Sequence, residues 1–476
     1  MVGIRLSLNS TAAFRQRTKR IARVLASGAL GLTLVLPLVS PPEALAAKQR
    51  TRRVARGVVH KVIRYRGVPR VVHVVVADVS GPVSLKVGLA RGTLPGAEPV
   101  SSMARRHGAV AAINGDFFRP SGRPVAAFAV NRQLVQTPLA WSANIAFSRG
   151  GASAFIGHQD VAVRLVSRFS GSKRRVARVN LGRPRRKQIR LYTRQGGRLT
   201  RPPKDACAAR LSRRGPFTIH PSSSTVSANY RVERVACRRH RMALKGGMVV
   251  ASRRRGPGRD YIQDLRGQRR QRLEWSLGWP KVAETLGGNP VLVKDGEIAW
   301  HNLRGMSSPL FQPHPRTGIG LRKDGKIMFV TVDGRRPRYS RGISMIGFAK
   351  LMRSLGAEWA LNLDGGGSTT MVVGGKVVNR PSDGRQRAVG SALLLVRDGA
   401  KRRTSTVTTE GEEEDLVSDV RTIIDTRVSI ATAEQDPASV GGLSSWLMSE
   451  GRMLPPSLRG VAGRFDAARL VGRRDR

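Results

Sequence analysis

The chain has 476 residues, 40% of them hydrophobic and 5% aromatic, enough for one large core or for two to three average domains. Its formal net charge of +54 favours polyanionic partners such as nucleic acid, anionic lipid or an anionic wall polymer, although a general preference for arginine would give the same composition. No helix-turn-helix, RNA-recognition or zinc-finger pattern is present, so we expect no specific nucleic-acid recognition.

The N-terminus has the pattern of a signal peptide. A basic stretch ending at Arg23 precedes an apolar run over residues 24–39, and Ala44-Leu-Ala46 offers a small-residue cleavage site. We therefore expect residues 1–47 to be removed near Ala46 or Ala47, leaving a secreted protein or one associated with the cell wall or an anionic membrane surface. An uncleaved anchor is the alternative, because the run is near the lower length limit of a membrane span.

The next segments predict a linker and the first strands. Residues 48–70 are basic and are interpreted as a linker. Val71–Val79 is rich in β-branched residues and predicts a strand, with Val83–Ala90 as its hairpin partner. Residues 100–107 predict a short helix, and Val110–Ile113 predicts a buried strand that leads into Asn114-Gly115-Asp116.

The middle of the chain, residues 161–272, is interpreted as a basic insertion or variable region that faces a polyanion, with solvated loops as the alternative. Its arginines and lysines cluster at residues 173–178, 183–187, 238–241 and 253–255. Cys207 and Cys237 lie in this region and are the only cysteines. In an exported chain they predict one disulfide, and two reduced buried thiols are the alternative.

Regular patterns return after this region. Leu286–Val293 reads as a glycine-rich turn into a strand, and further strands are expected at residues 316–321, 326–332, 371–378 and 388–396. Ser344 is expected to cap the one clear helix, Met345–Leu355. The fold class is therefore α+β, a mixed β-sheet core with few helices in one large catalytic domain over residues 71–398. Residues 399–476 are polar, partly acidic, and are interpreted as a disordered tail.

The most informative stretch is the short apolar strand Ala360–Leu363, which ends in Asp364, three glycines and Ser368-Thr369-Thr370. A rigid strand would hold Asp364 at the edge of an open site, and the N–H groups of Gly365, Gly366 and Gly367 could converge on an anion. Similar polar clusters follow apolar runs elsewhere, and they supply candidate carboxylates, phosphate-binding arginines and sugar-binding side chains at Asp116, Asp333, Arg316, Arg335, Asn114, Asn289, Ser368 and Thr369. His314 is a secondary candidate for acid or base catalysis.

Four ordered motifs, Ala112–Phe118, Arg316–Gly320, Val332–Arg335 and Trp359–Met371, resemble the phosphodiester glycosidase family, and the resemblance spans residues 71–396. It implies a pocket shared by Asn114, Asp116, Arg316, Asp333, Arg335 and the loop Asp364–Thr369, without assigning a role to each carboxylate. The usual alanine of the second motif is Gly318 here, and the usual glutamate after the helix cap is Gly347.

The resemblance implies an exported hydrolase that cleaves the sugar–phosphate bond of a glycosyl phosphodiester, such as an α-N-acetylglucosamine-1-phosphodiester in a cell-wall glycopolymer. A phosphate leaves more readily than an alkoxide, so cations that hold the phosphodiester matter more than a strong general acid. No cofactor is expected; the carboxylates could bind a hard cation such as calcium, but the sequence has no complete ligand loop. The alternatives are a non-catalytic protein that binds sugar phosphates or wall polymers, and a polyanion binder driven by charge alone.

Overall fold

The structure is a computed structural model that describes residues 47–398 apart from 141, 168–169, 183, 186–187, 198, 201–205, 220–222, 238–241, 244–246, 253–255, 269 and 304–310. The expected signal peptide, except Ala47, and the expected C-terminal tail lie outside these residues. So do two of the basic clusters, residues 238–241 and 253–255, and part of the cluster at 183–187.

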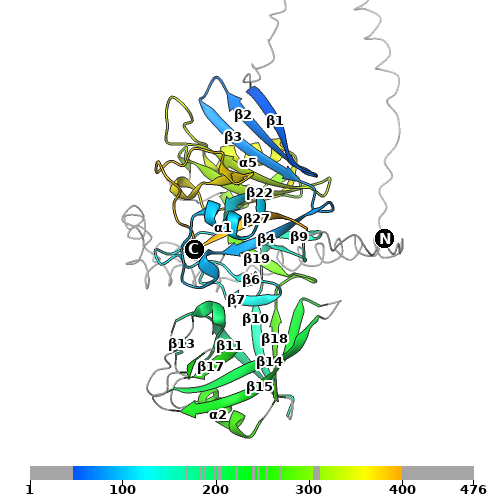
Figure 1. Ribbon diagram of the computed structural model, residues 1–476, viewed down its shortest axis with the longest axis vertical. Helices are drawn as coiled ribbons and strands as arrows, with labels where there is room; N and C mark the ends of the chain where they lie inside the picture. The colour runs from blue at the N-terminus through cyan, green and yellow to red at the C-terminus, as the bar shows by residue number, and fades with distance from the viewer. Residues whose placement is uncertain are drawn as a thin grey trace, which may run out of the picture. The chain divides into compact units, whose positions relative to one another are not determined.

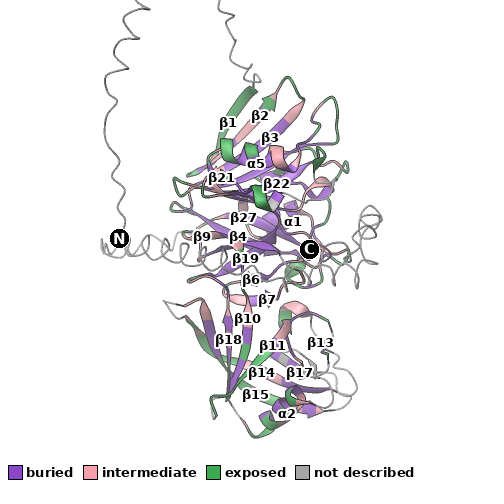
Figure 2. Ribbon diagram, turned by 180° about the vertical axis from the view of Figure 1, so that it is seen from behind, coloured by how far each residue is buried: buried purple, intermediate pink, exposed green. Residues whose placement is uncertain are grey.

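The largest sheet has eight strands, all paired antiparallel. In spatial order these are β1 (Ala47–Ala55), β2 (Val58–Tyr65), β3 (Arg70–Ala77), β23 (Ile327–Val332), β22 (Arg316–Arg322), β24 (Ala357–Asn362), β20 (Val291–Lys294) and β21 (Glu297–Ile298). The central strands are rich in β-branched and other apolar residues and are buried on both faces, as Figure 2 shows.

A second sheet packs against the first. Its order is β26 (Lys376–Val377), β25 (Met371–Val373), β5 (Ala109–Asn114), β27 (Ser391–Arg397) and β4 (Val83–Leu89). One core cluster joins the facing sides of the two sheets and contains Phe329 and Ile319 from the first and Ile113 and Leu393 from the second. Two-sided burial explains why these strands appear in the sequence as continuous apolar runs.

A helix covers the outer side of each of these sheets. Helix α5 (Met345–Ser354) packs on the eight-stranded sheet through Phe348 and Met352, and α1 (Val100–Arg106) packs on the second sheet through Met103. Gly318 lies under α5, where a Cβ atom would come within 2.9 Å of Phe348 Cζ. The glycine that replaces the family's usual alanine therefore lets this aromatic ring approach the strand.

A third sheet leads into a closed barrel. The sheet has the order β7 (Gln133–Gln136), β6 (Phe128–Val130), β19 (Glu284–Gly288), β8 (Ala143–Phe147) and β9 (Ala154–His158). Between β9 and β19 the chain forms the barrel, made of β10 (Ala162–Ser167), β11 (Lys173–Val179), β12 (Ile189–Tyr192), β17 (Met248–Ser252), β14 (Cys207–Ile219), β15 (Thr225–Cys237) and β18 (Arg270–Ser276). Short elements complete the described fold: α2 (Pro257–Asp264), α3 (Trp300–Leu303) and the pair β13 (Leu199–Thr200) and β16 (Met242–Ala243).

The structure confirms a sheet-dominated fold with few helices in the part of the chain that it describes. It also confirms the disulfide, which joins Cys207 on β14 to Cys237 on β15. The Ser344 hydroxyl caps α5 by accepting a 3.1 Å hydrogen bond from the Gly347 N–H. Because this donor belongs to the backbone, the cap forms even though residue 347 is a glycine.

Three local expectations are wrong. Residues 48–65 are not a linker: they form the paired strands β1 and β2, in which Val58, His60 and Ile63 are buried. Strand β4 pairs with β27 instead of forming a hairpin with β3. Gly287 and Gly288 end strand β19 rather than forming a turn, and Cβ atoms there would collide with Ala126 and with the Asn362 carbonyl. These glycines give close packing, which the sequence cannot distinguish from a turn.

Candidate functional site

The candidate site lies where β5 of the second sheet and β24 of the first sheet end. The Asp364 N–H donates to the Gly115 carbonyl at 3.1 Å, and Asn114 Nδ2 donates to the Asp364 carbonyl at 2.6 Å. Asn114 Oδ1 accepts from Thr317 Oγ1 at 2.9 Å and from the Thr370 N–H at 3.1 Å. The side chain of Asn114 is therefore buried and joins the two sheets, so its expected contact with a sugar stays a prediction that this geometry does not favour.

Asp116 is buried directly behind this junction. Its Oδ2 accepts a 2.7 Å hydrogen bond from the Ala126 N–H, and its own N–H donates to Ser391 Oγ. Burial raises the pKa of this carboxyl to about 7, against the opposing effect of backbone N–H groups, and the charge of Asp364 contributes to the increase. Near neutral pH, the protonation state of Asp116 therefore depends on the charge of Asp364.

Asp364 is half-buried, whereas Asp116 is almost completely buried. Burial raises the pKa of Asp364 to about 6, although a hydrogen bond with the Ser368 side chain and the charge of Arg387 favour the ionised form. Arg387 Nη1 lies 3.5 Å from Ser368 Oγ, and its Nε and Nη2 donate to Asp383 Oδ2 at 3.0 and 2.7 Å. The arginine thus stands beside the carboxyl while being held by a second aspartate.

The glycine loop forms a single 3₁₀ turn, Gly366–Ser368, instead of an open ring of N–H groups. The N–H groups of Gly366, Ser368 and Thr369 donate to the carbonyls of Pro315, Gly365 and Gly366. These three donors are therefore used within the protein. The glycines serve close packing: a Cβ at Gly367 would collide with Arg387 and Asp383, and Gly366 has φ +58° with Arg335 Nη2 3.1 Å from its Cβ position.

Arg316 and Arg335 flank this turn from the side of β22. Arg316 is buried and donates through Nε to the Ile343 carbonyl at 3.1 Å and through Nη2 to the Gln312 carbonyl at 3.1 Å. Burial, followed by the charge of Arg335, lowers its pKa to about 10. Arg335 is exposed, with its guanidinium at Gly366. His314 lies near both arginines, and burial followed by their charges lowers its pKa, so the imidazole is neutral at pH 7.

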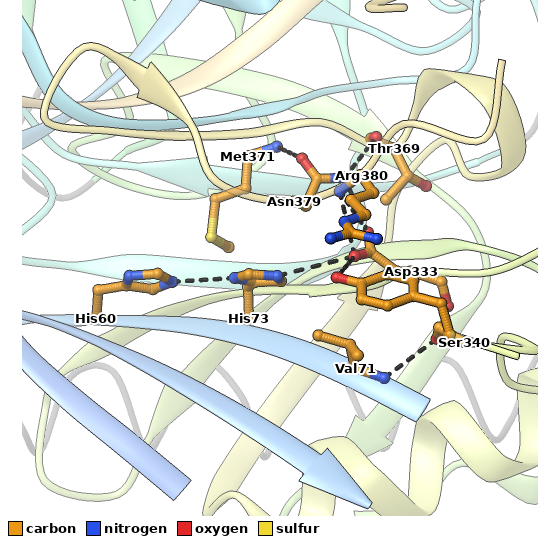
Figure 3. A network of polar contacts seen from close by, with 10 residues as sticks. His60, Val71, His73, Asp333, Ser340, Thr369, Met371, Asn379 and Arg380 are labelled. Atoms are coloured by element: carbon orange, nitrogen blue, oxygen red, sulfur yellow. Dashed lines mark hydrogen bonds and ion pairs between the residues drawn. The ribbon is translucent and has the colours of Figure 1, made fainter. Parts of the chain in front are cut away.

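Asp333 belongs to a separate network that reaches the loop through one intermediate residue (Figure 3). Its carboxylate accepts from Asn379 Nδ2 and the Arg380 N–H at 3.1 Å each and from the Tyr339 hydroxyl at 3.0 Å. Asn379 in turn donates to the Thr369 carbonyl and accepts from the Met371 N–H. The expected catalytic role of Asp333 stays a prediction, and these contacts favour a positioning role.

The same network continues into β2 and β3. His73 Nε2 lies 3.8 Å from Asp333 Oδ2, and His73 Nδ1 lies 3.2 Å from His60 Nε2. Burial, reinforced by nearby positive charge, lowers the pKa of His73 to about 3 and that of His60 to about 4. Both imidazoles are therefore neutral in the folded protein at physiological pH.

The remaining predicted residues have clear positions. Ser368 and Thr369 are fully buried; Thr369 Oγ1 lies 3.3 Å from Thr317 Oγ1. The carbonyl of Asn289 accepts from Asn362 Nδ2 at 2.8 Å, at the point where β20 meets β24. The described residues contain no group of three or more His, Cys, Asp and Glu side chains that could hold a metal ion. No helix among them is long and apolar enough to cross a membrane.

Sequence reasoning missed four residues that shape the site, namely Thr317, Asn379, Arg380 and Arg387. Asn379 and Arg380 follow a tight glycine hairpin and resemble ordinary loop residues. Arg387 is one of many arginines in a strongly basic chain, and no local pattern distinguishes it. Thr317 lies inside the Arg316–Gly320 motif, where its position next to Arg316 was the only available signal.

The fold and the site thus define a protein of packed β-sheets in which two carboxyl groups with raised pKa values meet at the junction of two sheets, next to a glycine turn that three arginines flank. Residues 226–396 match the sequence model of the phosphodiester glycosidase family, which confirms the resemblance indicated by the motifs. This segment contains Arg316, Asp333, Arg335 and the Asp364 loop, whereas Asn114 and Asp116 lie before it.

Curated relatives match over short segments. The SPbeta prophage-derived uncharacterized protein YomE of Bacillus subtilis is 46% identical over 82 residues, which is 17% of this chain and 13% of that protein. The N-acetylglucosamine-1-phosphodiester alpha-N-acetylglucosaminidase of Mus musculus is 35% identical over 68 residues, 14% of this chain and 13% of that enzyme. The chain therefore matches about an eighth of the length of these relatives.

Two solved structures share the fold. A hypothetical protein from Synechocystis aligns with a TM-score of 0.56 and 22% identity, over 74% of this chain and 64% of that one. A protein of Burkholderia pseudomallei, described as a candidate exported protein, aligns with a TM-score of 0.56 and 19% identity, over 75% of this chain and 97% of that one. At these identities the similarity establishes the fold alone.

Proposed function

We propose that the protein is an exported hydrolase that cleaves the bond between the anomeric carbon of a sugar and a phosphodiester oxygen. The observation that carries this proposal is the position of Asp364, a half-buried residue with a pKa raised to about 6, beside Arg387 and at the start of the turn whose Gly366 lies against Arg335. The match of residues 226–396 to the phosphodiester glycosidases supports the same reaction class.

The arrangement suits a substrate whose leaving group is already an anion. Arg335 is exposed at the loop and can pair with phosphate oxygens in the bidentate geometry that a guanidinium allows. Asp364, ionised above pH 6, can approach the anomeric carbon or orient a water molecule toward it. Water then supplies the hydroxyl group of the released sugar, and the phosphomonoester leaves with the electron pair of the broken C–O bond.

Asp116 acts on this reaction through its neighbour. It is 2% exposed, and its oxygens face backbone N–H groups, so we assign it to setting the ionisation of Asp364 rather than to contact with the sugar. Asn114 holds the loop through the Asp364 carbonyl, and Asp333 holds it through Asn379, which donates to the Thr369 carbonyl.

Export is proposed on two features of the chain. The N-terminal sequence has the order of a signal peptide, and the Cys207–Cys237 disulfide is the kind of bond that persists in an oxidising compartment. The substrate proposed for such a protein is a sugar phosphodiester of a cell-wall glycopolymer.

The test is release of sugar by the full chain from a synthetic α-N-acetylglucosamine-1-phosphodiester, compared with the D364N and R335Q variants. We expect D364N to lose at least about a hundredfold in kcat, and R335Q to raise KM. Arg338→Gln is the matched control, because Arg338 is an exposed arginine of the same loop. Unchanged turnover in D364N, or binding of the phosphodiester by the native chain without any turnover, would overturn the proposal; the second result would indicate a sugar-phosphate binding protein.

A further inference from the structure

The outer surface of the barrel carries a group of arginines that the candidate site does not use. Arg164 on β10, Arg175 on β11, Arg214 on β14, Arg231 on β15, and Arg270 and Arg272 on β18 are all exposed. We call these six residues the barrel arginine face. Their strands are neighbours in the barrel, since β11 pairs with β10, β10 with β18, β18 with β15, and β15 with β14.

The strand register places members of this face directly opposite one another. Arg164 lies opposite Arg175 on one side and Glu274 on the other. Arg231 lies opposite Arg270. Asn229 lies between Arg214 on one side and Arg272 on the other. Residues directly opposite share one face of a sheet with Cβ atoms about 5 Å apart, and like charges in these positions lower stability. The barrel therefore retains an arrangement that folding alone disfavours.

Few carboxylates neutralise this face. Among the described residues, Glu274 pairs with Arg272 at 2.8 Å and with Lys173 at 4.0 Å, and Glu233 pairs with Arg214 at 3.8 Å. Within that same part of the chain, Arg164, Arg175, Arg231 and Arg270 form no ion pair. The face thus has a positive excess that an external anion can balance.

None of the aromatic residues that the structure describes on these strands is exposed. Phe217 on β14 is half-buried, with its ring in edge contact with Trp275 and covered by the Arg213 guanidinium. Tyr230 and Trp275 are buried because side chains alternate along a strand, and they contribute to the barrel core instead. Proteins that bind single-stranded nucleic acid combine positive charge with exposed aromatic rings on which bases stack. The barrel arginine face offers the charge without such rings, which favours a partner recognised through its phosphates alone.

We propose that the barrel arginine face binds a flexible glycopolymer whose repeating units are joined by phosphodiesters, and that it retains such a polymer on the enzyme during cleavage. Arginines two residues apart on one strand are about 6.8 Å apart, and neighbouring strands about 4.8 Å, so the face presents a grid on which a chain of phosphates can settle in several registers. The role in cleavage rests on the proposed function, whereas the binding itself does not.

The experiment compares R164Q/R175Q/R231Q/R270Q with a control variant, R66Q/R105Q/K323Q/K350Q, that loses the same charge at exposed positions outside the barrel. The four barrel changes leave the ion pairs of Glu233 and Glu274 intact and relieve two like-charge contacts, so the barrel should fold at least as stably as before. The probe is soluble poly(glycerol phosphate), with binding measured by fluorescence anisotropy over a range of salt concentrations.

We expect the barrel variant to bind at least about tenfold more weakly at physiological ionic strength, and the slope of log K against log salt to fall by about 3, for four lost phosphate contacts. The control should bind nearly as the native chain does. Equal binding by the two variants would overturn the proposal. Tighter binding of oligo-dT than of poly(glycerol phosphate) at equal charge would also overturn it, in favour of nucleic acid.

A second measurement separates this proposal from the proposed function. Turnover of the small glycosyl phosphodiester should be unchanged in the barrel variant, while KM for a polymer whose units are joined through glycosyl phosphodiesters should rise. If the native chain cleaves neither substrate and the polymer still binds through the barrel, the proposed enzymatic function is wrong and the proposed binding surface is supported. If the native chain cleaves both substrates and the barrel variant cleaves the polymer equally well, the surface fails and the enzymatic assignment stands.

Discussion

Asp116 links the protonation of the site to the stability of the fold. Its pKa is raised to about 7 in the folded protein, above the ordinary value of 3.8, so between about pH 4 and pH 7 the folded chain holds a proton that the unfolded chain releases. The resulting contribution to the stability of the fold is fully present below pH 4 and is lost as pH rises through 7. The D116N variant needs no proton at this position. We predict that its free energy of unfolding lacks the decrease of about 1.4 kcal/mol per pH unit that Asp116 causes in this pH range.

The measurement is urea denaturation of the native chain and of D116N at pH 5 and pH 8. We expect D116N to gain stability relative to the native chain at the higher pH. Asp160→Asn is the control, because Asp160 is exposed. A difference between native and D116N chains that is the same at both pH values would contradict the prediction, and would mean that Asp116 titrates as an ordinary carboxyl.

At the scale of single residues, the sequence predicts which residues form the candidate site better than it predicts their roles. Asp116 and Asp364 follow strands of their own sheets, and a short polar cluster after an apolar run was enough to identify them. Their contact depends on the Asp364 N–H bonding to the Gly115 carbonyl, across residues distant in sequence. Arg387 could not be identified, because its position beside Ser368 arises only from the folded loop.

Strands β2 and β3 make stability depend on pH in the opposite direction to Asp116. His60 and His73 are buried, stack with ring centroids 5.4 Å apart, and have pKa values lowered to about 4 and about 3. The unfolded chain binds protons at these histidines below about pH 6.5, where the folded chain does not. Their stabilising contribution is therefore present above pH 6.5 and is lost as pH falls toward 4 and 3.

We predict that H73Q unfolds with a shallower acid dependence than the native chain between pH 4 and pH 6.5, by about 1.4 kcal/mol per pH unit. H73Q should also be less stable at pH 7.5, since the substitution disturbs a tightly packed network. Denaturant unfolding at several pH values tests this, with His301→Gln as the control because His301 is exposed. An H73Q curve parallel to that of the native chain would show that His73 does not titrate on unfolding.

The elements were predictable where one strong pattern decided them. The buried strands β3, β22, β23 and β24 and the capped helix α5 lie close to their expected positions because their apolar runs and cap residues are unambiguous. The sequence predicts a linker in place of strands β1 and β2, because their basic residues obscure the alternation. Strand β1 is almost wholly exposed, so it has no apolar side for a pattern to reveal.

For the molecule as a whole, the barrel is the feature that the sequence described least well. The sequence of residues 161–272 is basic and shows no clear pattern of strands or helices. These residues nevertheless form most of a closed barrel, with a core of its own around Leu165, Val250, Leu273 and Trp275. Its strands alternate apolar and basic residues, and the many arginines made that alternation resemble solvated loops. The disulfide is predictable because it needs only two cysteines in a chain whose N-terminus has the pattern of a signal peptide.

The Cys207–Cys237 disulfide closes one end of the long β14–β15 hairpin, across 30 residues of sequence. A bond that closes a loop of this length restricts the unfolded chain, and we predict that C207A/C237A lowers barrel stability by about 3–4 kcal/mol. Hydrogen exchange by mass spectrometry checks this: protection should fall in β14, β15 and β18, while β22, β23 and β24 keep theirs. Equal loss in both regions would contradict it and would mean that barrel and sheets unfold together.

Strand β1 at the edge of the eight-stranded sheet has a further consequence for how copies of the protein meet. An outermost strand presents unpaired N–H and C=O groups on which the edge of another copy can assemble. On β1 the exposed side chains include Lys48, Arg50, Arg52 and Arg53. Two such edges repel each other, so the strand is protected against aggregation at physiological ionic strength. Concentrated salt screens this repulsion, and storage at high salt therefore removes the protection that the charge provides.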